Sequence, residues 1–154
     1  MTNIPKIKKS EIISPSGLSE MWIETGIDCP LKCSYCFNSA GGIRYETGTL
    51  SWGAYENILN QFKDLGGSTI GIPGAGEPLV GKNLETTLKI LDFTEKNGMN
   101  LVIFTSGFEV SEKTIDAINK KNVSLMLKYN SSDPAIQDDL VKMKNYLIAV
   151  RDFF

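Results

Sequence analysis

The apolar run Met21-Trp22-Ile23 leads through a short segment into Cys29-Pro30-Leu31-Lys32-Cys33-Ser34-Tyr35-Cys36. This stretch holds all 3 cysteines of the 154-residue chain, which has no histidine. Three clustered thiols are typical of a metal site, but a structural zinc usually takes four protein ligands. Zinc would therefore need an Asp, a Glu or another chain to complete its coordination. A four-iron cluster held by three cysteines has one iron free to bind something else.

A disulfide with a leftover thiol is the alternative that would suit a secreted protein. Residues 1–9 carry charges and lack the apolar stretch of a signal peptide. We therefore expect reduced thiols and a cytoplasmic protein.

The spacing of the cysteines, with an aromatic residue directly before the last one, resembles the cluster-binding loop of the radical S-adenosylmethionine (radical SAM) superfamily. The resemblance implies that Cys29, Cys33 and Cys36 hold a [4Fe-4S] cluster whose fourth iron is chelated by the amino and carboxylate groups of SAM. It also implies reductive cleavage of SAM to methionine and a 5′-deoxyadenosyl radical, which abstracts hydrogen from a substrate. The cofactors carry this chemistry and the protein positions them. Tyr35 is expected to pack near the adenine.

A second motif, Gly74-Ala75-Gly76-Glu77-Pro78-Leu79, follows the β-rich run 68–73. The Rossmann fingerprint would require glycine in place of Leu79, and the Gly-Lys-Ser/Thr of a phosphate loop is absent. The segment is similar to the Gly-Gly-Glu-Pro turn of the superfamily, with Ala75 at the first paired glycine. The resemblance implies that Gly76 and Glu77 lie near the amino group of SAM. The alternative is an ordinary turn at a strand end.

Polar residues also follow the next two predicted strands. The run 100–105 is typical of a fully buried strand, and Ser106-Gly107 after it resembles the Thr-Asn-Gly segment of the superfamily, although a plain turn is the alternative. The strand 123–129 leads into Asn130 and Ser131, which are candidate contacts to the ribose or carboxylate of SAM. Lys128 either faces a ligand or extends from the sheet edge.

Helices are predicted between the strands. Ser51 and Asn83 are expected to cap two of them, and a third begins near Ser111. Asp133-Pro134 is typical of a cap followed by proline at the first helical position. The final stretch has apolar residues at helical spacing, which predict a packing surface: Ile136, Leu140, Met143, Leu147 and Val150.

The alternation of strands and helices predicts an α/β fold with a parallel sheet and right-handed crossovers. The resemblance implies a partial (β/α) TIM-like barrel with parallel strands, containing about four of the usual six βα units. All candidate ligands would then lie at the carboxyl ends of the strands. We expect residues 1–19 to form an N-terminal extension and residues 20–154 to form the core domain.

The chain ends on Phe153-Phe154 inside an amphipathic pattern, so the core domain is expected to be incomplete at its C-terminus. A truncated gene product and a minimal enzyme are both open interpretations. In an incomplete barrel the fourth strand would present an unpaired edge and an uncovered apolar face.

The amino-acid composition excludes several classes of protein. The net charge is −2 and the apolar fraction is 42%, which is normal for one modest domain. No apolar run approaches the length of a membrane span, and the basic residues at 6–9 are too few to indicate nucleic-acid binding. The expected partners are a low-potential electron donor of flavodoxin or ferredoxin type and an unknown substrate, which could be a peptide, a protein or a small metabolite. A non-catalytic metal or Fe-S binding module and an inactive fragment are the alternative functions.

Overall fold

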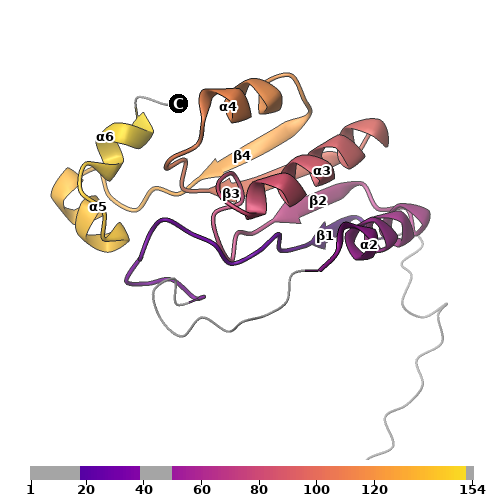
Figure 1. Cartoon of the computed structure of the whole chain (residues 1–154), viewed down its shortest axis with the longest axis horizontal. Helices are drawn as coiled ribbons and strands as arrows, with labels where there is room; N and C mark the ends of the chain where they lie inside the picture. The colour runs from indigo at the N-terminus through magenta and orange to yellow at the C-terminus, as the bar shows by residue number, and fades with distance from the viewer. Residues whose placement is uncertain (1–17, 39–49, 152–154) are drawn as a thin grey trace, which may run out of the picture.

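The computed structural model describes residues 18–38 and 50–151. The predicted extension 1–19 lies almost wholly outside the described residues, as do Phe153 and Phe154. Strands and helices alternate along the chain (Figure 1). The strands are β1 Glu20–Trp22, β2 Thr69–Ile72, β3 Asn100–Thr105 and β4 Val123–Leu127. The helices are α2 Trp52–Asp64, α3 Asn83–Lys96, α4 Glu112–Ile118, α5 Pro134–Val141 and α6 Tyr146–Arg151.

The four strands form one sheet in the order β1-β2-β3-β4, and every neighbouring pair is parallel. This confirms the predicted α/β fold with a parallel sheet. The carboxyl ends of all four strands therefore lie at the same edge, so the segments that follow them can meet there. None of the described helices combines the length and the apolar composition that a bilayer crossing requires.

One face of the sheet carries the main hydrophobic core. Side chains alternate between the faces of a strand, so Ile70 and Ile72 of β2 share a face with Leu101 and Ile103 of β3. These residues pack against α2, α3 and α4 through buried side chains that include Leu59, Phe62, Ile90, Leu91 and Ile118.

The opposite face is open, so the prediction of a fully buried β3 is wrong. Trp22 is 51% exposed, Phe104 39% and Met126 50%. Helices cover only one side of the described sheet, and only every second residue of β3 lies in the core.

The predicted caps at Ser51 and Asp133 are confirmed, and so is the predicted helix start near Ser111, which is a third cap. The side chains of Ser51, Ser111 and Asp133 accept hydrogen bonds from backbone N–H groups in the first turns of α2, α4 and α5. The cap predicted at Asn83 is wrong, because Asn83 is the first residue of α3 and Lys82 precedes it without a side-chain bond. The amide of Asn83 is buried and donates to the carbonyls of two neighbouring loops instead.

The final stretch forms two helices. Between α5 and α6 the backbone passes through left-handed conformations at Lys142 (φ 58°) and Asn145 (φ 59°). Both helices lie at the carboxyl end of the sheet, near the loop that follows β1 (Figure 1). Their buried residues Val141, Tyr146 and Val150 form a second hydrophobic cluster with Leu31 of that loop. Ile136 is 52% exposed, so it does not belong to the predicted packing surface.

Candidate functional site

A cavity of about 240 Å³ lies at the carboxyl ends of the strands. It is formed by four segments: the cysteine loop, the glycine-rich turn after β2, the end of β3 and the end of β4. Its lining residues are Cys29, Leu31, Cys33, Tyr35, Cys36, Phe37, Pro73, Gly74, Ala75, Gly76, Phe104, Thr105, Ser106, Met126, Leu127 and Lys128. The three cysteines are free thiols. The predicted gathering of candidate ligands at this edge of the sheet is therefore present in the structure.

The cysteine loop is held by α5 and by the segment that precedes it. The backbone N–H of Ser34 donates to the Leu140 carbonyl at 2.9 Å, and that of Lys32 donates to the Val141 carbonyl at 3.3 Å. The hydroxyl of Tyr35 donates to Oδ1 of Asn130 at 2.8 Å. Because these bonds join residues far apart in the sequence, they fix the loop relative to the sheet.

The glycine-rich turn is fixed against the segment that leads into the cysteines. The N–H of Ala75 donates to Oε2 of Glu24 at 2.6 Å, and the N–H of Glu77 donates to the Asp28 carbonyl at 2.7 Å. Nδ2 of Asn83 donates to the Asp28 carbonyl at 2.8 Å and to the Glu77 carbonyl at 3.0 Å. Gly76 packs so closely on Ile27 and Asp28 that a Cβ there would overlap their backbone atoms. The turn and the cysteine loop therefore form one unit.

Glu77 is a buried carboxylate, only 2% exposed. Its Oε1 accepts from the Thr105 hydroxyl at 2.6 Å and the Leu79 N–H at 3.2 Å. Its Oε2 accepts from the Ser106 N–H at 2.7 Å and the Ser106 hydroxyl at 2.6 Å. The three bonds from Thr105 and Ser106 tie the glycine-rich turn to the end of β3.

The structure brings together six of the nine predicted site residues in the cavity wall: the three cysteines, Tyr35, Gly76 and Ser106. The other three, Glu77, Asn130 and Ser131, are not among the described residues that line it. The N–H groups of Asn130 and Ser131 donate to Oε1 of the buried Gln137 at 3.0 and 2.9 Å.

The sequence analysis did not identify the residues that support the cavity walls. Four side chains do so through hydrogen bonds: those of Glu24, Asn83, Gln137 and Tyr146. Glu24, Asn83 and Tyr146 each bind a partner distant in the sequence, and Gln137 binds backbone N–H groups just before α5 that no sequence motif marks.

The sequence model of the radical SAM superfamily matches residues 23–150. This chain belongs to the radical SAM superfamily. The match spans the cysteine loop, strands β2 to β4, helix α5 and all but the last residue of α6. A search of curated proteins found no match to the chain.

Solved structures agree with the radical SAM assignment. The chain is similar to Streptococcus suis SuiB bound to S-adenosylmethionine, with a TM-score of 0.70 and 25% identity over 84% of this chain. A second SuiB structure, bound to precursor peptide SuiA, gives a TM-score of 0.68 at 24% identity. BtrN in complex with AdoMet and 2-DOIA shares the fold, with a TM-score of 0.57 at 24% identity over 75% of this chain. The matched region spans 29% of the SuiB chain and 47% of the BtrN chain.

Burial governs the electrostatics of this radical SAM cavity. It raises the pKa of the Cys29 thiol, and the negative charge of Glu77 adds to that increase. Burial also raises the pKa of Cys33, against the lowering effects of a hydrogen bond with Tyr35 and of the positive charge of Lys128. Burial and the neighbouring Cys33 raise the pKa of Tyr35. A metal that binds here must therefore displace protons from neutral thiols.

The donor set fits the cluster expected of a radical SAM protein. Among the described residues, no three Cys, Asp or Glu side chains converge closely enough to hold a single ion. An iron–sulfur cluster does not require the thiolates to converge on one point, because each cysteine ligates a different iron of the cluster. The three thiols line one cavity, as the ligands of a single cluster would.

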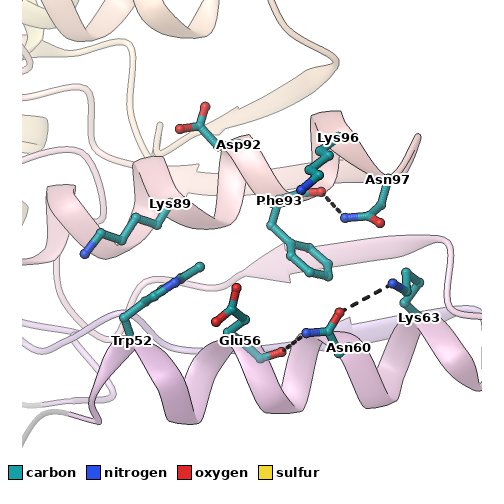
Figure 2. Close-up of a pocket in the computed structure, with 9 residues that line it drawn as sticks. All are labelled: Trp52, Glu56, Asn60, Lys63, Lys89, Asp92, Phe93, Lys96 and Asn97. Atoms are coloured by element: carbon teal, nitrogen blue, oxygen red, sulfur yellow. Dashed lines mark hydrogen bonds between the residues drawn. The ribbon is translucent and has the colours of Figure 1, made fainter.

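A second pocket, of about 360 Å³, lies between α2 and α3 (Figure 2). Its charges are mixed, and several already have partners: Lys89 pairs with Glu85 at 2.7 Å, and Asp92 pairs with Lys121. Trp52 and Phe93 contribute aromatic surface, and the described lining contains no cysteine. The pocket belongs to the outer helical layer, so the cysteine cavity is the candidate site.

Proposed function

We propose that this chain is a radical SAM enzyme core that binds a [4Fe-4S] cluster through Cys29, Cys33 and Cys36 and binds SAM in the adjoining cavity. The proposal includes reductive cleavage of SAM to a 5′-deoxyadenosyl radical that abstracts hydrogen from a substrate. The observation that carries it is the meeting of three thiols, the glycine-rich turn and the end of β3 around one cavity. When bound, the cluster and SAM supply the one-electron chemistry.

The residues of the chain bind and orient the cluster and SAM, and they exclude water from the cavity. The thiols lose their protons and ligate iron, while Tyr35 presents its ring at the cavity wall. The turn at Gly76 offers backbone groups whose position is fixed by Glu24 and Asn83. Apolar side chains make up much of the remaining wall, and they limit the access of water to the reacting groups.

Radical SAM proteins also need an electron source and a substrate. We expect a low-potential donor of flavodoxin or ferredoxin type, because the cluster must receive its electron from outside the site. The two solved relatives were crystallised with a precursor peptide in one case and with 2-DOIA in the other. A peptide, a protein and a small metabolite are all candidate substrates. The proposal assigns residues 20–154 to the core domain and the protein to the cytoplasm.

The test is anaerobic reconstitution with iron and sulfide, followed by dithionite reduction and electron paramagnetic resonance with and without SAM. We expect a cluster signal that changes when SAM is added, together with release of methionine and 5′-deoxyadenosine. Cys33→Ala should lose both the signal and the products. Ser34→Ala is the matched control, since it lies in the same loop and keeps the backbone bond to Leu140.

The alternative functions predict different results. A non-catalytic Fe-S module would form a cluster whose signal is indifferent to SAM. A zinc module would bind zinc in place of a cluster, and an inactive fragment would bind neither stably. Any of these outcomes would overturn the proposed activity.

A further inference from the structure

Lys128 is a fixed cation in the wall of the cysteine cavity. It directly follows β4, and its Nζ lies 4.4 Å from the centroid of the Tyr35 ring. This is within the range of a cation–π contact. The ring is itself held by the bond from the Tyr35 hydroxyl to Asn130.

The backbone of Lys128 is anchored on both sides. Its N–H donates to the Thr105 carbonyl at 2.9 Å, which extends the pairing of β3 with β4. Its carbonyl accepts from the Tyr146 hydroxyl at 3.3 Å. Both the origin and the end of this long side chain are therefore positioned.

The charge of Lys128 is directed at the cavity. The ion pairs of the described residues use Lys89, Lys121 and Lys142. Glu77, a buried carboxylate nearby, is already bound by four donors from β3 and its own turn. Lys128 lines the same cavity as Cys33 and Tyr35. Its charge therefore lies beside the thiolate that would ligate iron.

A cluster held by three thiolates is anionic, and one-electron reduction makes it more so. A cation at the cavity wall stabilises the reduced form more than the oxidised form, by Coulomb attraction. We propose that Lys128, held on the Tyr35 ring, raises the reduction potential of the cluster bound by Cys29, Cys33 and Cys36. The electron comes from the low-potential donor, which is oxidised as the cluster is reduced, and no proton or bond changes place. This inference rests on the proposed function.

The experiment is a potentiometric titration of the reconstituted full chain with dithionite, monitored by electron paramagnetic resonance and performed without SAM. Lys128→Met should shift the midpoint potential to more negative values. The shift is about 59 mV for each tenfold decrease in the equilibrium constant of the one-electron reduction. Lys128→Arg keeps the charge and should stay near the wild-type value.

Lys89→Met is the matched control. Lys89 also lies over an aromatic ring, with its Nζ 5.7 Å from the Trp52 centroid, but it borders the pocket between α2 and α3 (Figure 2). Its removal should leave the potential unchanged. This control separates the charge at the cavity from a general change in protein charge.

The outcomes separate the two proposals. If the wild-type chain forms no cluster, the proposed function fails before Lys128 is tested. If a full cluster forms and Lys128→Met keeps the wild-type potential, only the role of Lys128 is overturned. If Lys128→Met cannot assemble a cluster, a cluster in Lys128→Arg supports the need for a positive charge at this position. Loss of the cluster in both variants overturns the role of the charge.

Discussion

Glycine is required at position 76 because a side chain would not fit there. A substitution at this position tests how the glycine-rich turn packs against the segment that leads into the cysteine loop. A Cβ at this position would lie 2.6 Å from the Ile27 carbonyl carbon and closer still to the Asp28 oxygen. Both are backbone atoms, so neither can turn away. We expect Gly76→Ala to destabilise the fold by about 1–3 kcal/mol and to weaken retention of the cluster.

Urea unfolding of the apo protein and the iron content after reconstitution would measure the two effects of Gly76→Ala. Gly53→Ala is the control, because Gly53 lies in α2 with no atom closer than 4.0 Å to the added carbon. It should be stabilising, by about 0.5–1 kcal/mol. Equal stability of the two variants would contradict the argument from space.

The half-buried thiols give a second prediction at the residue scale. Burial raises the pKa of Cys29 and Cys33 in the folded chain. Above the pKa of the unfolded thiol, the unfolded state binds fewer protons than the folded state, so stability falls as the pH rises. In the apo protein, alkylation of Cys29 by iodoacetamide should have a higher midpoint pH than in urea. Peptide mass spectrometry can follow each cysteine, and identical midpoints in the two states would contradict the prediction.

The candidate site could be predicted where its residues are close in the sequence. The spacing of Cys29, Cys33 and Cys36 and the turn at Gly76 are local patterns, and the structure places them on one cavity. The sequence did not decide whether Lys128 faces a ligand, because its role depends on Tyr35, a residue distant in the sequence. The cap predicted at Asn83 failed for a related reason: its amide donates to the Asp28 carbonyl, which only the tertiary fold brings near, as well as to the Glu77 carbonyl.

At the scale of elements, α5 and the cysteine loop are packed as one unit. Val141 is buried with Leu31, and its carbonyl accepts from the loop backbone. We expect Val141→Ala to destabilise the apo protein by about 1–3 kcal/mol through the cavity it leaves. Because the loop loses packing, the variant should also retain less cluster, although Val141 ligates no iron.

Ile136→Ala is the control for Val141→Ala, since Ile136 lies on the same helix but is 52% exposed. Iron and sulfide content after gel filtration, together with urea unfolding, would compare the two variants. A fully loaded Val141→Ala protein would mean that α5 does not preorganise the loop.

The order of elements follows from the sequence better than their packing does. Apolar and β-rich runs and capping residues are local signals, so they predicted the four strands, the caps at Ser51 and Asp133 and the helix start near Ser111. The apolar spacing of the last stretch did not reveal the break between α5 and α6, because left-handed conformations at Lys142 and Asn145 have no apolar signal. The composition of β3 did not show that one of its faces is open, since burial depends on what covers the sheet.

At the scale of the whole molecule, the described sheet is unusual because it is parallel and covered by helices on one face only. Parallel sheets are ordinarily covered on both faces. On the open face the rings of Trp22 and Phe104 lie 5.6 Å apart, and Gly71 of β2 leaves the space in which the Trp22 ring lies. Phe104 and Met126 continue from this face into the cysteine cavity. The open face and the candidate site are therefore one continuous apolar surface.

This surface should bind the dye anilinonaphthalene sulfonate, whose fluorescence rises on exposed apolar surface. We expect strong fluorescence with the folded apo protein and a clear decrease in Phe104→Ser, because that side chain joins the Trp22 ring to the cavity. Ile148→Ser is the control, since Ile148 is 47% exposed on α6 and lies outside this surface. Circular dichroism must show that both variants are folded. If the two variants lower the fluorescence equally, the dye reports scattered apolar residues, and the continuity of the open face with the cavity has no consequence for binding.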